Sequence, residues 1–347
     1  MPNNAFYNNL LFTSAGRRSY LIKYFRKELT GKGLVHVANS GRLCTAFLEA
    51  DKTVITPLIY DDSYIKFILN YCYYHKIKAI IPLFDIDIPV LASHDDEFSK
   101  FGVSLVCSPA HVAITCNDKW QSYLFLRKNG LYAPKSINSL DKAQQALHTG
   151  EIEFPVIIKP RWGMGSIGIY QADNKAELEL LYQKTFRDIE KSYLRYESKS
   201  YIKEAVIIQE KLNGQEYGLD VVNDLAGNYV TTFVKKKLAM RAGETDAAVS
   251  VSSDILSELG YKLSMALGHH ANLDVDVFLI DNKPYILEMN ARFGGGYPFS
   301  HLAGANLPKA ILSWLNGKPA DPSCFEIREG VISMKNIEPR AYDISYA

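Results

Sequence analysis

Short apolar runs alternate with helical patterns over the first part of the chain. The first run, NLLFTS, is typical of a buried strand, and the AGRR turn after it leads to Leu21, Phe25 and Leu29 at helical spacing. Strands that alternate with helices predict an open parallel sheet. The expected strands are residues 9–14, 34–39, 78–83 and 103–108, with a tyrosine-rich helix near 62–75.

The pattern changes near residues 112–116, where we expect a domain boundary. Asn117 or Asp118 can cap a helix whose apolar positions run to the Asn129-Gly130 stop. The elements expected next are a strand at 154–160, a glycine loop at 161–168 and a long charged helical region at 174–204.

Two β-rich blocks follow, and alternating apolar and polar residues predict a hairpin in each. The first turns around residues 223–228. The second, LDVDVFLIDNKPYILEMNAR, turns around Asp281-Asn282-Lys283. If that loop holds three residues, Phe278 pairs with Ile286 and Asp276 with Glu288.

The second hairpin brings carboxylates together. Directly opposed residues have Cβ atoms about 5 Å apart, and like charges at that distance destabilise a strand pair. Asp276 opposite Glu288 is therefore a poor choice for structure alone, unless a cation lies between them. With Asn290, on the same strand face as Glu288, they form an oxygen-only set suited to Mg²⁺ or Mn²⁺. The alternative is a solvated, charged strand face, and a register error of one residue would remove the site.

The composition of the chain limits the number of lobes and the classes of partner and site that we expect. With 347 residues, 47% of them hydrophobic, the chain can form two or three linked lobes. Lys+Arg at 39 against Asp+Glu at 38 leaves a net charge of +1, so no global field favours nucleic acid or an anionic membrane. The five cysteines form no CxxC pair, which argues against disulfides and zinc. No signal-peptide pattern and no apolar run of roughly 20 residues occurs, so we expect a cytoplasmic protein.

Two lysines lie where an anion could bind. Lys119 is in the first turn of its helix, where the macrodipole disfavours a cation by roughly 0.3 to 1 kcal/mol. A phosphate contact and a solvent-facing side chain are both consistent with that place. Lys159 lies just before the loop that contains Gly163, Gly165 and Gly168, whose backbone N–H groups can approach an anion closely. The loop lacks GxxxxGK[ST], so it is not a Walker A motif.

The segment VIIQEKLNGQEYGLDV, residues 206–221, contains groups that suit a nucleoside. Adenine needs an apolar slot with polar edges, and ribose needs a carboxylate. Gln209 and Glu210 end a predicted strand just before the apolar Leu212, and Glu216 follows. Either glutamate could equally be a strand-end charge.

In this order the segments resemble an ATP-grasp ligase along nearly the whole chain, with a preceding α/β domain like those of the carbamoyl phosphate synthetase large-chain group. The combination is specific, although no single piece is. The segments that carry the resemblance are TSAGRR, PLFDIDIP, CNDK, IIKPRWGMGSIG, QEKLNGQEYGLDV and LEMNARFGGGYP. It implies an N-terminal open parallel α/β domain followed by a two-lobed ATP-grasp fold. The expected domains are residues 1–114, 115–205 with a glycine-rich lid loop, 206–322 with the metal site, and 323–347 as a C-terminal extension.

The resemblance also implies roles for particular residues. Arg292 would stabilise the reacting phosphate or carboxylate, and Asp276, Glu288 and Asn290 would bind Mg²⁺. Lys237 and Arg241 would contact the γ-phosphate or the acid substrate, with an exposed basic hairpin as the alternative. The nucleotide-binding residues it implies are Lys119, Lys159, Gly163, Gly165, Ser166, Gln209, Glu210, Lys211, Leu212 and Glu216.

The implied reaction converts a carboxylate into an acyl phosphate, which an amine attacks to give an amide or peptide-like bond, ADP and phosphate. ATP and Mg²⁺, or Mn²⁺, are the expected cofactors, small carboxylic acids and amines the expected substrates, and a homodimer the default assembly. An ATP-grasp carboxylase or other acid-activating synthetase and a silent ATP-binding regulator are the alternatives. A dinucleotide oxidoreductase is disfavoured because SAGRRS is not GxGxxG. Without a glutaminase domain or a second ATP-grasp half, full carbamoyl phosphate synthesis is not expected.

The loops after the first and third strands lie where an open α/β sheet presents its ligand crevice. We expect Arg17 and Arg18, with Asp85 and Asp87, to select an acidic acceptor and an amine donor, such as an amino acid or a sugar acid. The glycines of GGGYP, after Arg292, would let the backbone approach a substrate anion.

A histidine pair, His269-His270, lies at the end of a predicted helix. Cations there complement the helix dipole, so we expect both histidines to act as cations. No serine-histidine or CxxxH arrangement elsewhere suggests nucleophilic catalysis.

Overall fold

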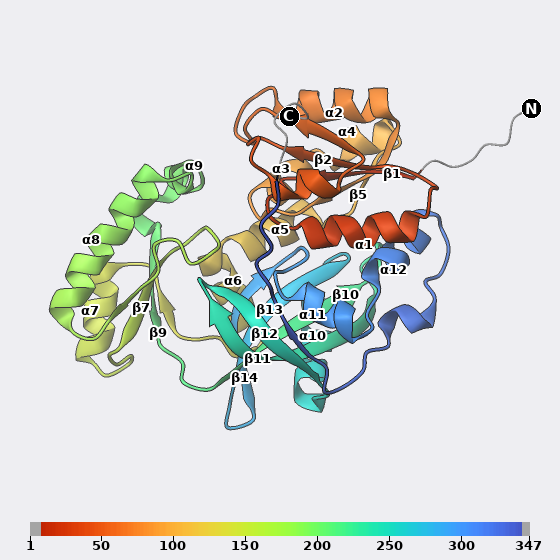
Figure 1. Ribbon diagram of the computed structural model, residues 1–347. Helices are drawn as coiled ribbons and strands as arrows, with labels where there is room; N and C mark the ends of the chain where they lie inside the picture. Colours follow the sequence, from red (N-terminus) through yellow and green to blue (C-terminus); the bar gives the residue numbers. More distant parts are fainter. Residues whose placement is uncertain (1–7, 342–347) are drawn as a thin grey trace, which may run out of the picture.

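A computed structural model describes residues 8–341 of the chain. Figure 1 shows three parts: an α/β domain at the top, a lid lobe at the left and a C-terminal lobe below both. Their sheets contain five, four and six strands, respectively. The predicted fold class, an open parallel domain followed by a two-lobed fold, is confirmed.

The N-terminal domain is built on a parallel sheet with strand order β3-β2-β1-β4-β5. Apolar residues fill both faces, because Leu10 and Phe12 pack with α1 on one side while Leu11 and Ile80 belong to a separate core on the other. The fourth predicted strand is much shorter than residues 103–108. The strands are β1 (Asn9–Thr13), β2 (Val35–Asn39), β3 (Lys52–Ile55), β4 (Ile77–Pro82) and β5 (Ser104–Leu105); the helices are α1 (Ser19–Leu29), η1 (Thr45–Glu49), α2 (Tyr64–His75), α3 (Asp87–Ala92), α4 (Asp95–Lys100) and α5 (Ala110–Asn117).

The lid lobe has an antiparallel sheet of order β6-β9-β7-β8, against which α7 and α8 pack. Because β9 pairs with β7, it belongs to this lobe, past the predicted boundary at residue 205. The long helical region is three segments that break at Ser192 and Ser198. Before this lobe comes α6 (Lys119–Lys128), whose Leu126 packs in the core of the C-terminal lobe. The elements of the lid lobe are β6 (Ser136–Ile137), α7 (Leu140–His148), β7 (Val156–Pro160), β8 (Tyr170–Ala172), α8 (Lys175–Lys191), α9 (Leu194–Ser198), η2 (Lys199–Glu204) and β9 (Val206–Glu210).

The C-terminal lobe is an antiparallel sheet of order β14-β13-β10-β11-β12-β15, with α10 packed on one face. β15 pairs with β12, so residues 332–334, predicted to belong to a separate extension, are the sixth strand of this sheet. The elements are β10 (Gln215–Asn223), β11 (Tyr229–Arg241), β12 (Glu244–Val251), α10 (Asp254–Leu267), β13 (Asn272–Ile280), β14 (Lys283–Asn290), α11 (Tyr297–Ala303), α12 (Leu307–Leu315), η3 (Pro322–Phe325) and β15 (Ile332–Met334).

In the β13–β14 hairpin Asp276 faces Glu288, as predicted, although the turn of the hairpin differs from the prediction. Its turn has two residues rather than three, since Ile280 pairs with Lys283, and Asp281 and Asn282 both have positive φ, as type I′ turns require. This shortening alone would move Asp276 out of register with Glu288. A bulge between Asp276 and Val277 absorbs one extra residue of β14, and Asp276 lies opposite Glu288 again.

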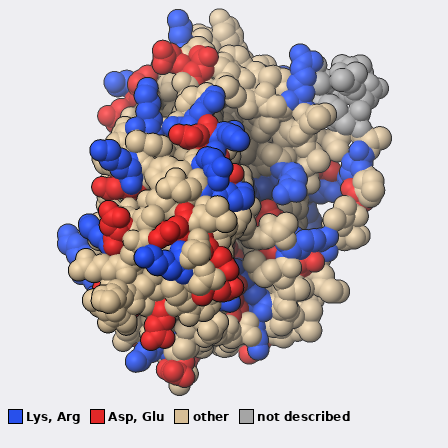
Figure 2. Space-filling model, turned by 90° about the vertical axis from the view of Figure 1, so that its left-hand side faces the viewer, with Lys and Arg blue, Asp and Glu red and all other residues tan. Residues whose placement is uncertain are grey.

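Charges are mixed over the surface. Figure 2 shows Lys and Arg interspersed with Asp and Glu over one face of the molecule. All five cysteines are buried and unbonded to each other, as expected for reduced thiols. Within residues 8–341 there is no helix with the length and apolar character needed to cross a membrane.

Candidate active site

A cleft of about 530 Å³ lies where the three parts of the molecule meet. The β1–α1 turn lines it from the N-terminal domain, the glycine loop from the lid lobe, and strands β10 to β14 from the C-terminal lobe. A larger cavity of about 920 Å³ lies between α1 and α12, and none of the predicted site residues lines it. The smaller space is lined by the three predicted metal ligands and by Lys237 and Arg292.

The floor of the cleft is a row of residues in register across four strands. Lys235 on β11 pairs with Gly218 on β10, Gly218 with Asp276 on β13, and Asp276 with Glu288 on β14. A Cβ on Gly218 would lie 3.5 Å from Cε of Lys235 and 3.6 Å from Cε of Lys237. The missing side chain leaves room for both lysines to lie across the sheet toward the acids.

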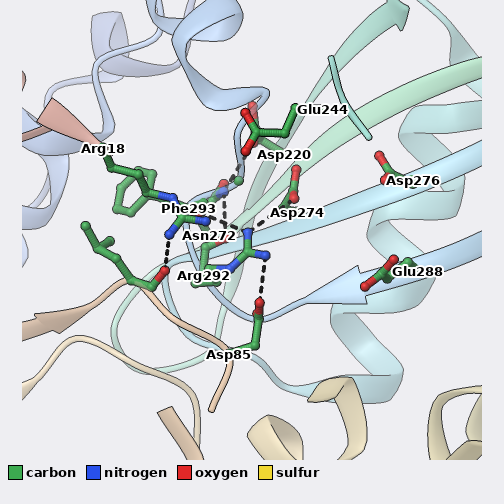
Figure 3. Close-up of polar contacts among 12 residues, drawn as sticks. Arg18, Asp85, Asp220, Glu244, Asn272, Asp274, Asp276, Glu288, Arg292 and Phe293 are labelled. Carbon is green, nitrogen blue, oxygen red and sulfur yellow. Dashed lines mark hydrogen bonds and ion pairs between the residues drawn. The ribbon is translucent and has the colours of Figure 1, made fainter. Parts of the chain in front are cut away.

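The predicted metal ligands Asp276, Glu288 and Asn290 all line this cleft. Figure 3 shows Asp276 and Glu288 on neighbouring strands of the sheet. Cations already lie beside both acids, because Lys237 Nζ is 2.6 Å from Asp276 and Lys119 Nζ is 3.5 Å from Glu288.

The part of the chain that the structure describes contains no cluster of three His, Cys, Asp or Glu side chains suited to a metal. The candidate set differs from such a cluster because its third member is the amide of Asn290, and an oxygen-only set of this kind suits a divalent cation. An ion here would take two carboxylates and one amide oxygen, and would keep positions for water and phosphate oxygens, as Mg²⁺ does in nucleotide sites.

Electrostatics keep Glu288 ionised. Burial alone would raise the pKa of Glu288, but Lys119, Lys159 and Arg292 outweigh it and hold the pKa below its usual value. Lys159 is itself buried, and desolvation lowers its pKa to about 8, although Glu288 opposes the shift. Its Nζ donates to Oε1 of Gln209 at 2.8 Å. An anion entering beside these lysines would meet preorganised positive charge.

Lys119 is positioned by a buried ion pair that the sequence did not reveal. Asp118 accepts from the backbone N–H groups of Trp120 and Gln121 at the start of α6, which confirms it as the helix cap. It also accepts two bonds of 2.7 Å from Arg161, whose side chain is 2% exposed. The carbonyl of Arg161 accepts from Lys119 N at 3.0 Å. The helix cap Asp118, Lys119 and the first residue of the glycine loop are therefore held together.

Most of the predicted nucleotide residues lie around two small spaces that share Lys119, Lys159 and Glu288. One adds Gln209 and apolar residues of α6 and β14, and the other adds the lid residues Gly163, Gly165 and Ser166. The remaining four do not line these spaces. Glu210 accepts from Lys135 N at 2.7 Å, Glu216 pairs with Lys237 at 2.5 Å, Lys211 is exposed and Leu212 is half-buried.

Arg241 is not brought to the cleft, contrary to the prediction. Lys237 and Arg241 are four residues apart and would share a face of a regular strand. The register of β11 with β12 shifts between Lys237 and Ala239, and again before Met240, which breaks this alternation. Met240 lines the cleft instead, while Arg241 is 45% exposed and pairs with Asp246.

Arg292 links the sheet to the N-terminal domain. Its guanidinium lies 2.9 Å from Asp85, which follows β4, and 3.5 Å from Asp274 on β13 (Figure 3). Burial alone would lower the pKa of Arg292, but Asp85 and Asp274 raise it above its ordinary value. Burial, reinforced by the charge of Asp276, raises the pKa of Asp274 to about 7. Asp274 was not predicted, although it stands two residues before Asp276 in LDVDV.

Asp87 does not select a substrate, contrary to the expectation. It is fully buried under the sheet edge and accepts from Ser14 Oγ at 3.0 Å and Tyr64 OH at 2.7 Å. Burial raises the pKa of this carboxyl. Its bonds join α3 to α2 and to Ser14, the residue after β1, which is a structural role, whereas Asp85 reaches Arg292 at the cleft.

The three glycines after Arg292 make room for charged side chains of the protein itself. A Cβ on Gly294 would lie 2.0 Å from Cγ of Asp274. On Gly295 it would approach Nζ of Lys335 to 3.4 Å, and on Gly296 Cε of Lys235 to 3.3 Å. None of the three has a positive φ, so the requirement is close approach rather than backbone conformation.

The histidine pair does not act as the predicted cations. His269 is fully buried, and its Nε2 lies 3.0 Å from the carbonyl oxygen of Val221. Burial lowers its pKa to about 4, so the ring is neutral at neutral pH. The helix end is instead Gly268, in the left-handed conformation. Burial also lowers the pKa of His270.

Comparison with protein families agrees with this architecture. Residues 10–106 match the model of the PylC-like N-terminal domain. Residues 116–296, which hold the lid lobe and most of the C-terminal lobe, match the model of the ATP-grasp domain.

Known proteins with similar sequences or folds carry out different reactions. The arginine-specific large chain of carbamoyl phosphate synthase from Bacillus subtilis is 21% identical over 301 residues, which are 84% of this chain but only 26% of that protein. The biotin carboxylase domain dimer of 2-oxoglutarate carboxylase from Hydrogenobacter thermophilus, solved with MgADP, ADP and bicarbonate, aligns with a TM-score of 0.73, at 17% identity, over 94% of this chain and 73% of that one. The L-amino acid ligase of Bacillus licheniformis aligns with a TM-score of 0.68, at 19% identity, over 88% and 74%.

Proposed function

We propose that this chain, which belongs to the ATP-grasp family, joins a small carboxylic acid to an amine through an acyl phosphate and releases ADP and phosphate. The observation that carries the proposal is the facing pair Asp276 and Glu288, with Lys119 and Lys159 beside it. Opposed carboxylates flanked by buried lysines suit a nucleotide triphosphate with its divalent cation better than they suit a stable sheet.

We assign residues to the nucleotide by the small spaces that they line beside the cleft. Lys119 and Lys159 would hold phosphate oxygens, under the lid residues Gly163, Gly165 and Ser166. Asp276, Glu288 and Asn290 would hold Mg²⁺, with Mn²⁺ as a substitute. When bound, the ion supplies charge that offsets the negative charge on the phosphate oxygens.

The chain itself contributes fixed charge and exclusion of water. A carboxylate is a poor electrophile until phosphorylated, and the developing charge on the transferred phosphoryl group needs cations that are already in place. Arg292 is held by Asp85 and Asp274, so its guanidinium needs little reorganisation. The lid meets the β11–β12 turn, where a Cβ on Gly243 would lie 1.9 Å from Oγ of Ser166. A closed lid would protect an acyl phosphate from hydrolysis.

The decisive experiment measures ADP release with pools of carboxylic acids and amines at saturating Mg²⁺ and ATP. The ligase proposal expects release only when an acid and an amine are both present. Release that depends on bicarbonate would favour a carboxylase instead. Tight ATP binding with no response to any pool would favour a regulatory protein without turnover.

Two further properties belong to the same proposal. We expect the chain to work in the cytoplasm and to form a homodimer, since one fold relative was solved as a dimer. Light scattering at micromolar concentration tests the dimer, and a molar mass near the 39.1 kDa of one chain would reject it.

A further inference from the structure

The end of the cleft that faces the N-terminal domain carries charged groups that the proposed nucleotide site does not use. Arg18 lines it from the β1–α1 turn, Glu244 from β12 and Asp274 from β13. Figure 3 shows Arg18 extending toward Arg292, with Asp274 on the other side of Arg292.

Arg18 lacks the acidic partner that its neighbours have. Arg17 pairs with Glu244 at 3.7 Å and Arg292 with Asp85 at 2.9 Å. Arg18 donates from Nη1 to the carbonyl of Leu83, and among residues 8–341 it forms no ion pair with a carboxylate. Burial, and then the charge of Arg292, lower the pKa of Arg18, so its surroundings disfavour its own charge. An anion placed beside it would relieve that cost.

Asp274 has only a long contact to a cation that another acid holds more closely. Lys335 lies 3.2 Å from Glu244, Lys237 lies 2.6 Å from Asp276, and Lys119 lies 3.5 Å from Glu288. Asp274 has Arg292 at 3.5 Å, and that guanidinium lies closer to Asp85. Asp274 pairs directly with Asn290, at the edge of the proposed metal site.

We propose that this end of the cleft binds the amine substrate as an amino acid, with its carboxylate on Arg18 and its ammonium group beside Asp274. The inference rests on the proposed ligase function and names the class of its second substrate. The amine would then lie next to the place where the acyl phosphate forms. Its nitrogen bonds to the acyl carbon as the carbon–oxygen bond to phosphate breaks. Of the two protons that the ammonium group loses, one leaves on hydrogen phosphate and one goes to solvent.

The test compares amino acids with their decarboxylated amines in the ADP-release assay. We expect the decarboxylated amines to have a kcat/KM roughly 10- to 100-fold lower, the usual value of a charge-assisted hydrogen bond. Arg18→Gln should raise KM for the amino acid by a similar factor and leave KM for ATP unchanged, while Arg18→Lys should recover part of the loss. Asp274→Asn should also raise KM for the amino acid.

The matched control is Arg26→Gln, which removes a guanidinium from α1, the helix that begins directly after Arg18, at a residue that pairs with Asp51 outside the cleft. It should behave as the wild type. Decarboxylated amines that react equally well, or an unchanged amino-acid KM in both Arg18 variants, would overturn the inference while the ligase proposal stands. If no acid and amine pair releases ADP at all, the ligase proposal fails and this inference fails with it.

Discussion

The ammonium group of Lys237 lies 2.6 Å from Asp276 and 2.5 Å from Glu216, so one buried cation bridges two carboxylates on separate strands. Burial alone would lower the pKa of Lys237, but Asp276 and Glu216 raise it above its ordinary value. Lys237 therefore stays charged at neutral pH. It offsets part of the like-charge repulsion between Asp276 and Glu288 until a divalent cation arrives.

Replacing Lys237 by methionine should destabilise the metal-free protein by roughly 2 to 4 kcal/mol, because it leaves two largely buried carboxylates without their cation. Mg²⁺ should raise the melting temperature of this variant more than that of the wild type, since the ion then replaces the missing charge. Thermal unfolding in EDTA and in Mg²⁺ measures both effects.

Lys236→Met is the matched control, because Lys236 is the neighbouring residue on β11 and its side chain points to the opposite face. Its melting temperature should respond to Mg²⁺ as the wild type does. An equal Mg²⁺ response in the Lys237 variant would contradict the bridging role.

Breaking the buried pair of Arg161 and Asp118 should strongly destabilise the protein, because it leaves a buried charge without its partner. Arg161→Met leaves Asp118 buried without its bidentate partner, so we expect a loss of about 3 to 5 kcal/mol in the free energy of unfolding by urea. Arg187→Met, at an exposed residue of α8, should change it by less than about 0.5 kcal/mol. Similar values for the two variants would refute the structural role.

His269 should make the protein less stable in mild acid. Its pKa is about 4 in the folded state and near 6.5 when unfolded, so the unfolded chain binds a proton that the folded one excludes. Stability from this group is complete above pH 6.5 and falls as the pH drops toward 4, by about 3 kcal/mol in total. His269→Gln should flatten the curve of unfolding free energy in that window, and an unchanged slope would show that His269 is not the source.

Gly294→Ala should disturb the contact between Asp274 and the loop after Arg292. Its Cβ would overlap the carboxyl group of a short, buried side chain, so we expect a loss of about 1 to 3 kcal/mol in unfolding free energy. Gly41→Ala is the control, since its Cβ would meet only Asn39 Nδ2, at 3.6 Å. A fully stable Gly294 variant would mean that the loop adapts freely.

The periodic parts of the fold could be predicted from the sequence, because period-2 and helical patterns report burial directly. The helix at Ser19–Leu29, the cap at Asp118 and the strand at Val156–Pro160 follow from such local patterns. The strand at 103–108 could not be bounded, because burial continues to Cys107 and Ser108, past the last backbone bond to β4, from Val106 N to the carbonyl of Ile80.

Site residues could likewise be predicted where a local pattern places them, and could not be where a distant contact or a register shift does. Asp276 and Glu288 were predicted as a pair, although the turn was predicted one residue too long and a bulge restored the register. Arg241 was misplaced because register shifts in β11 cannot be seen in residue spacing. Arg161 and Asp85 act through partners far away in the chain, and no local pattern encodes such a contact.

The most direct test of the proposed metal site is Mn²⁺ binding in the presence of ADP, followed by electron paramagnetic resonance. Glu288→Gln and Asp276→Asn should each weaken Mn²⁺ binding by at least roughly tenfold, because each removes a charged oxygen ligand. Asp281→Asn, which removes an exposed carboxylate from the turn of the same hairpin, should bind Mn²⁺ as the wild type does. Equal Mn²⁺ affinity in all three variants would place the cation elsewhere and contradict the assignment of the cleft.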